Sequence, residues 1–78
     1  MTVLLYGTEG CHLCDEAEAL IRSVISPEIK IKLIDIVDDD ALYQRYQLTI
    51  PVLQNPRKGD ELNWPFTTDN VREFLSIV

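Results

Sequence analysis

The stretch that decides the fold is VLLYGTEGCHLC, residues 3–14. Its first four residues form a continuous apolar run that ends at Gly7, which is typical of a strand covered on both faces. Cys11 and Cys14 follow after a short connection, and they are the only two cysteines in the chain. An acidic, amphipathic segment begins directly after them. The sequence therefore places a cysteine pair between a buried strand and the start of a helix.

The segment after the cysteine pair is predicted to be a helix over residues 14–25. Its apolar side chains fall at helical spacing, with the charged ones mostly on another face. This apolar set is Leu13, Ala17, Leu20, Ile21, Val24 and Ile25. Acidic residues near the start suit the positive end of the helix dipole. Ser26-Pro27 is expected to stop the helix, because proline cannot continue it.

The rest of the chain alternates between strand and helix patterns. Residues 29–37 predict a second strand, and residues 41–46 predict a short helix capped by the aspartates at 38–40, with Leu42 and Tyr46 facing the core. Residues 50–54 and 61–64 predict a hairpin, because turn-forming residues separate them. N-cap residues at 67–70 precede a last helix with apolar positions Val71, Phe74, Leu75 and Val78. The order β-α-β-α-β-β-α predicts an α/β fold: a four-stranded mixed sheet with helices on both faces.

Length and composition favour a single domain over residues 1–78. Hydrophobic residues make up 46% of the chain and charged residues 26%, which is ordinary for a globular protein. The net charge of -6 argues against binding to nucleic acid or to an anionic membrane, since both require a basic surface. No apolar run is long enough to span a membrane, and the first residues do not resemble a signal peptide. We therefore expect a monomer in the cytoplasm.

Cys11 and Cys14 have the placement that thiol chemistry requires. At a helix N-terminus, unpaired backbone N–H groups and the helix dipole stabilise a thiolate, which is the reactive form of cysteine. The spacing brings the second sulfur within bonding reach, so the pair can cycle between dithiol and disulfide. We expect Cys11 to attack a substrate disulfide and the more shielded Cys14 to resolve the mixed disulfide. His12 either favours the Cys11 thiolate when protonated or is an exposed residue without a role, and nearby carboxylates oppose the thiolate.

Zinc binding is a weaker interpretation of the cysteine pair. A structural zinc ion needs four ligands, and the chain offers only Cys11, Cys14 and His12 as sulfur or imidazole donors. We therefore predict no metal site within one chain, while a site shared between chains stays open. The aspartates at 38–40 are interpreted as helix caps, because a metal would need further carboxylates from elsewhere in the chain.

These residues resemble the glutaredoxin-like branch of the thioredoxin superfamily, and most closely its short bacterial members. The resemblance is carried by Leu4-Leu5-Tyr6, by GCHLCDEA at residues 10–17 and by YQLTIPVL at residues 46–53, and it spans roughly Val3 to Ile77. It implies a thioredoxin-like fold and thiol-disulfide oxidoreductase activity through Cys11 and Cys14. It also implies a cis bond at Ile50–Pro51, which would expose the Ile50 backbone for pairing with an extended substrate. His12, Ile50 and Pro51 are thus the expected substrate-binding residues.

The chain departs from the glutaredoxin pattern at several positions. His12-Leu13 stands where classical glutaredoxins have Pro-Tyr, Thr8-Glu9 precedes the pair where they commonly have a basic residue, and residues 64–69 lack their Gly-Gly step. An acidic chain is also a poor host for glutathione, which is anionic. We expect no bound cofactor, with glutathione or a reductase as the source of electrons. The expected partner is a disulfide-bearing protein or a small thiol.

Two functions of other classes stay open at this point. One is an iron–sulfur or metal carrier, in which a dimer shares a cluster through Cys11. The other is a non-catalytic interaction module that keeps the fold and uses its acidic surface for a partner.

Overall fold

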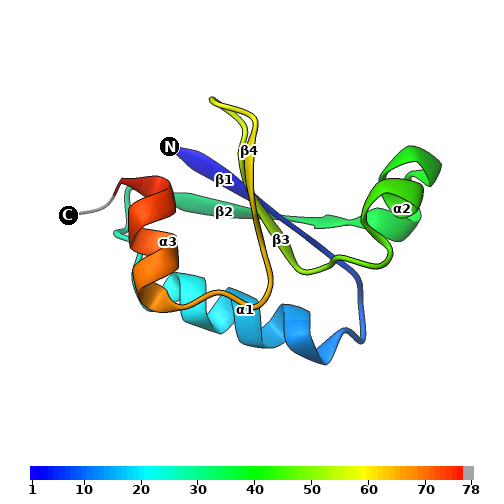
Figure 1. Cartoon of the computed structure of the whole chain (residues 1–78), viewed down its shortest axis with the longest axis horizontal. Coiled ribbons are helices and arrows are strands. Elements are labelled where there is room, and N and C mark those ends of the chain that lie inside the picture. Colours follow the sequence, from blue (N-terminus) through cyan, green and yellow to red (C-terminus); the bar gives the residue numbers. More distant parts are fainter. Residues whose placement is uncertain (77–78) are drawn as a thin grey trace.

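The computed structural model describes residues 1–76 and shows a four-stranded sheet with helices on both faces (Figure 1). The elements follow one another as β1 (Thr2–Gly7), α1 (His12–Arg22), β2 (Lys30–Asp35), the 3-10 turn η1 (Ile36–Asp38), α2 (Asp40–Tyr46), β3 (Val52–Asn55), β4 (Asp60–Asn63) and α3 (Thr68–Leu75). The strand order is β2-β1-β3-β4, in which β1 pairs in parallel with β2 while the other pairs are antiparallel. The predicted element order and the mixed sheet are thereby confirmed.

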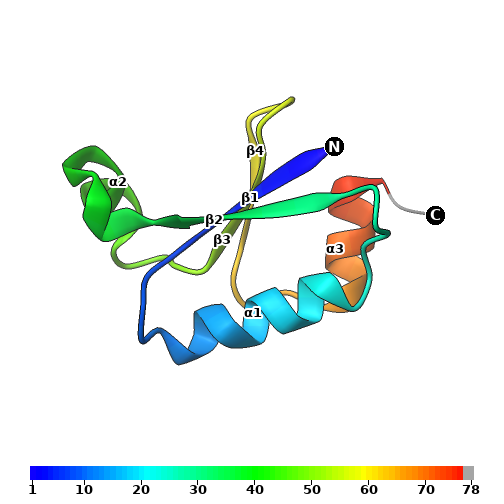
Figure 2. The ribbon, with the colours of Figure 1, turned by 180° about the vertical axis from the view of Figure 1, so that it is seen from behind.

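The side chains of β1 alternate between two hydrophobic clusters, one on each face of the sheet. Val3 and Leu5 join the larger cluster with α1 and α3, whereas Tyr6 joins the smaller cluster with Tyr46 of α2. Figures 1 and 2 show α1 and α3 together on one side of the sheet, with α2 lying apart from them. The apolar run at residues 3–6 is continuous because β1 is covered on both faces.

The predicted first helix is wrong at both ends. α1 starts at His12, with Cys11 as its N-cap, and ends at Arg22 instead of residue 25. The Ser23 hydroxyl donates a hydrogen bond to the Leu20 carbonyl at 2.6 Å, and the chain leaves the helix there. The two apolar residues after Ser23 still pack against the larger cluster, which explains why their spacing looked helical. Leu13 is 47% exposed, because the first turn of α1 lies outside both clusters.

The predicted second strand is also too long. β2 ends at Asp35, whose carboxylate accepts the Val37 N–H at 3.1 Å and so caps η1. Asp39 then accepts the N–H groups of the next helix, which confirms the capping interpretation of the aspartates. Tyr46 is buried and Leu42 is half-buried against the smaller cluster, as predicted.

The C-terminal hairpin and helix form as predicted, with bounds shifted by one or two residues. β3 begins at Val52 instead of residue 50, and β4 covers residues 60–63 instead of 61–64. Thr67 and Asn70 form a reciprocal capping box at the start of α3, with hydrogen bonds of 2.9 and 3.1 Å. Val78, the last predicted apolar position, lies outside the described residues. Within residues 1–76, no helix is long and apolar enough to cross a membrane.

A polar network joins α2 to the hairpin on the α2 side of the sheet. The Tyr46 hydroxyl donates a hydrogen bond to the Glu61 carboxylate, and the Arg45 guanidinium lies 3.8 Å from the same carboxylate. Gln54 donates to Glu61 at 3.4 Å and accepts from the Tyr6 hydroxyl at 2.8 Å. The rings of Tyr6 and Tyr46 stack with their centroids 4.4 Å apart. Burial, followed by the bond to Glu61, raises the pKa of Tyr46 to about 12.

We expect this network to make stability fall between about pH 10 and pH 12. The phenol of the unfolded chain loses its proton near pH 10, whereas the folded chain keeps it until about pH 12. The contribution is therefore complete below pH 10 and is lost as the pH rises through the folded pKa of Tyr46. Urea unfolding at a series of pH values measures this loss. The Tyr46→Phe variant should lack it, and an equal decline in that variant would contradict the assignment.

Candidate active site

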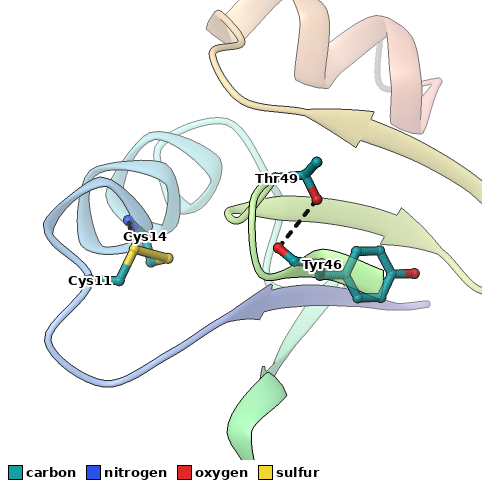
Figure 3. Close-up of a disulfide and its surroundings, with 4 residues drawn as sticks. All are labelled: Cys11, Cys14, Tyr46 and Thr49. Carbon is teal, nitrogen blue, oxygen red and sulfur yellow. Dashed lines mark hydrogen bonds between the residues drawn. A yellow bond between two sulfur atoms is a disulfide. The ribbon is translucent and has the colours of Figure 1, made fainter. Parts of the chain in front are cut away.

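The two cysteines meet at the start of α1. Cys11 is the N-cap residue, and its sulfur accepts the backbone N–H of Cys14 at 3.1 Å. The two residues form a disulfide with their Cα atoms 5.2 Å apart (Figure 3). Cys14 is buried within the first turn, whereas Cys11 is only half-buried. Cys11 is thus the sulfur that an incoming molecule reaches more readily.

The loop between β1 and α1 places Cys11 at the N-terminus of the helix. The Cys11 N–H donates to the Thr8 carbonyl at 3.3 Å, which closes a tight turn. Gly10 adopts φ +80° within this turn, a left-handed conformation that side chains other than glycine rarely take. The Asp15 N–H then donates to the Cys11 carbonyl at 3.2 Å and begins the helix. The local sequence thereby directs the Cys14 N–H toward the Cys11 sulfur.

Sheet pairing brings the start of β3 to the same end of the sheet as the cysteines. Tyr6 pairs with Val52 in antiparallel strands, so Pro51, the residue before Val52, comes level with Gly7 at the end of β1. The Ile50–Pro51 peptide bond is cis, as is the bond between Trp64 and Pro65. Pro51 is buried and Ile50 is half-buried, while His12 is exposed between the cysteines.

The segment before Pro51 is held by a single backbone carbonyl. The Tyr46 carbonyl accepts the N–H of Thr49 at 2.9 Å and the N–H of Ile50 at 3.0 Å. It also accepts the Thr49 hydroxyl at 3.3 Å, the bond drawn in Figure 3. Leu48, at the apex of this segment, is 92% exposed. The Ile50 N–H is therefore already used within the chain.

An acidic groove of about 250 Å³ opens beside Cys14, between the end of β1, α1 and β2. Apolar side chains of β1 and β2 line part of it, and its carboxylates are those of Glu9, Asp15, Glu18 and Asp35. Arg22 offsets one of these charges, since it pairs with Glu18 at 2.8 Å. Glu9 and Asp15 are close to the cysteines along the sequence, whereas the fold adds the carboxylates of Glu18 and Asp35. The local potential next to Cys14 is therefore negative and disfavours anionic ligands.

Gly7 is a site residue that the sequence pattern did not reveal. A Cβ atom at this position would lie 2.9 Å from the Cys14 sulfur and 3.2 Å from the Cys14 Cβ. Along the sequence, Gly7 only marks the end of an apolar run, and no spacing rule connects it to a residue seven positions later. Among residues 1–76, no group of three or more His, Cys, Asp or Glu side chains is placed to hold a metal ion.

The sheet, its helices and the cysteine pair at the start of α1 define a protein of the thioredoxin superfamily. Thioredoxin 1 from Thermosipho africanus matches the structure with a TM-score of 0.66 over 99% of this chain and 97% of that chain. At 17% identity this likeness shows the fold alone. The family model described as Glutaredoxin-like domain (DUF836) matches residues 2–76, and the chain belongs to this family. The predicted family and thioredoxin-like fold are thereby confirmed.

Two more similar structures come from bacterial proteins. A structural-genomics target protein from X. campestris, solved by X-ray methods, is 36% identical over 97% of each chain, with a TM-score of 0.82. A protein from Nitrosomonas europaea, solved by NMR, is 28% identical over 94% of this chain and 88% of that chain, with a TM-score of 0.78. No curated protein matches the chain. The names of these relatives state no activity, so they support the fold and the family.

Proposed function

We propose that the protein is a thiol-disulfide oxidoreductase in which Cys11 is the nucleophile and Cys14 is the resolving cysteine. The observation that carries this proposal is the position of the Cys11 sulfur, which accepts the Cys14 N–H at 3.1 Å at the N-cap of α1. After reduction, this N–H group and the helix dipole stabilise a negative charge on Cys11. The burial of Cys14 supports the asymmetry of the two roles.

The reaction balances as two successive exchanges. The Cys11 thiolate attacks one sulfur of the substrate disulfide, a mixed disulfide forms, and the other substrate sulfur leaves as a thiolate that takes up a proton. Cys14 then loses its proton and attacks the Cys11 sulfur, which releases the second substrate thiol and forms the Cys11–Cys14 disulfide. The substrate gains two electrons and two protons, and the pair loses them. An external dithiol, or two equivalents of a monothiol, restores the dithiol form.

We propose that the substrate lies along His12, Ile50 and Pro51, at the end of the sheet where β3 begins. An extended substrate segment would pair through the Ile50 carbonyl, because the Ile50 N–H is already bonded to Tyr46 at 3.0 Å. No bound cofactor is needed, and glutathione or a reductase supplies the electrons. The acidic groove beside Cys14 favours a disulfide-bearing protein or an uncharged thiol over glutathione as the preferred partner.

Alkylation of the reduced protein tests the assignment of roles. We expect Cys11 to react first, with a rate midpoint below pH 8.5, the approximate pKa of a free cysteine. Cys14 should react more slowly because it is buried within the first helical turn. Iodoacetamide pulses across pH, followed by peptide mass spectrometry, give both rates. Equal rates with an ordinary midpoint would instead support a non-catalytic interaction module.

A further inference from the structure

Gly7 is not required by the conformation of its own backbone. It is the last residue of β1 and pairs with Asp35 of β2, and its φ does not lie in the left-handed region that Gly10 and Gly59 occupy. Alanine could therefore adopt the same backbone conformation. What distinguishes position 7 is the space beside it, because the Cys14 sulfur lies where a Cβ would make a contact of 2.9 Å. Glycine at position 7 therefore avoids a steric clash with the Cys14 sulfur.

The backbone on either side of this contact is held in place. Gly7 pairs with Asp35 of β2, and the residue before it, Tyr6, pairs with both β2 and β3, so Gly7 cannot retreat without disturbing these pairs. On the other side, Cys14 is buried within the first turn of α1. A Cβ at position 7 would make its tightest contact with the Cys14 sulfur, which movement of that sulfur can relieve, whereas the approach of 3.2 Å to the Cys14 Cβ burdens both redox states alike.

The freedom of that sulfur differs between the two redox states. In the disulfide, the bond to Cys11 fixes the Cys14 sulfur beside Gly7. In the dithiol, the sulfur can rotate about χ1 to another staggered position, about 120° away. A methyl group at position 7 is therefore tolerated better by the dithiol than by the disulfide. An added group that penalises one state more than the other shifts the equilibrium between them.

We propose that Gly7 is a positioning residue that favours the disulfide form of the Cys11–Cys14 pair by leaving room for the Cys14 sulfur. This inference deepens the proposed function, since it concerns the redox balance of the same cysteine pair. The reaction concerned is the reduction of the pair by a small dithiol. Two electrons and two protons pass to the cysteines, and the small dithiol becomes its own cyclic disulfide.

Equilibration of the Gly7→Ala variant in buffers of reduced and oxidised dithiothreitol tests the proposal. After acid quenching and alkylation, mass spectrometry gives the fraction of dithiol at each ratio. We expect the equilibrium constant to shift about tenfold toward the dithiol, which corresponds to roughly 30 mV for a two-electron couple. A folded variant with the wild-type equilibrium constant would overturn the proposal.

Thermal unfolding of both redox states separates positioning from a merely structural role. We expect Gly7→Ala to lower the melting temperature of the oxidised protein more than that of the reduced protein. An equal loss in both states would refute the proposal, because the redox equilibrium would then be unchanged. Gly59→Ala is the matched control: a Cβ there meets no atom within 4 Å, and its strained φ of +76° lies in the distant hairpin turn. This control should lose stability in both redox states alike.

A background variant keeps the test decisive if oxidised Gly7→Ala does not fold. In the Cys14→Ala background the sulfur is absent, so adding Gly7→Ala should lower the melting temperature less than in the oxidised wild type. A double variant that also fails to fold would overturn the proposal. The equilibrium with dithiothreitol needs no protein substrate. A failure of the proposed function, seen as no turnover of any disulfide substrate, is therefore distinguishable from a failure of this inference.

Discussion

The Cys11→Ser variant is expected to reduce disulfide substrates at least about a thousandfold more slowly than the wild-type protein. A serine hydroxyl is not ionised near neutral pH, so it cannot use the N–H group and helix dipole that the Cys11 sulfur uses at 3.1 Å. The remaining sulfur, Cys14, is buried and presents itself poorly to a protein substrate. Turnover of a disulfide-bonded protein with dithiothreitol as reductant, corrected for the uncatalysed rate, measures the effect.

The Cys14→Ser variant is the matched control for this prediction. It keeps the attacking sulfur but cannot complete the second exchange, so a mixed disulfide between Cys11 and the substrate should accumulate. Intact-mass spectrometry without reductant detects that adduct, which the Cys11→Ser variant should not form. Retained turnover in Cys11→Ser, or an adduct on Cys14 in that variant, would contradict the assigned roles. Both variants should melt close to the reduced wild-type protein.

The order of the elements and the placement of the cysteines followed from the sequence because they depend on local patterns. The apolar run of β1 required burial on both faces, and the two hydrophobic clusters on either side of the sheet supply it. Asp39 caps α2 because its carboxylate accepts hydrogen bonds from the N–H groups two and three positions later, and this interaction needs no distant part of the chain. Cys11 precedes an amphipathic helix in the sequence, and it is the N-cap of α1 in the structure.

The predictions that were wrong depend on tertiary packing. Val24 and Ile25 continue the spacing of a helix, yet the chain has already left the helix at Ser23, because packing against the larger cluster does not require helical backbone. Leu13 fits the same spacing but is 47% exposed. A periodic pattern shows which side of a helix is apolar, but it does not show which turns of the helix extend beyond the sheet. The contact between Gly7 and Cys14 is of the same kind, because it joins a strand to a helix across a loop.

Tyr46 connects the α2 side of the sheet to the segment before Pro51. The residue is 4% exposed, its ring stacks on Tyr6, and its hydroxyl donates a hydrogen bond to Glu61. Its backbone carbonyl holds the N–H groups of Thr49 and Ile50 at 2.9 and 3.0 Å. The packing of one side chain therefore fixes the carbonyl on which the proposed substrate-binding segment depends. Loss of the ring should therefore loosen the segment at residues 49–50, although the hydrogen bonds that hold this segment come from the Tyr46 backbone.

The Tyr46→Ala variant is accordingly expected to lose about 3–4 kcal/mol of unfolding free energy, because it removes a large buried ring from the smaller cluster. Tyr46→Phe keeps the ring and removes only the hydrogen bond to Glu61, so it should lose about 1 kcal/mol. Urea unfolding gives both values, and hydrogen exchange of the Thr49 and Ile50 amides reports the segment. These amides should exchange faster in Tyr46→Ala than in Tyr46→Phe, measured where both variants are folded. If exchange at Thr49 and Ile50 is unchanged in a folded Tyr46→Ala protein, the segment is held by something other than Tyr46.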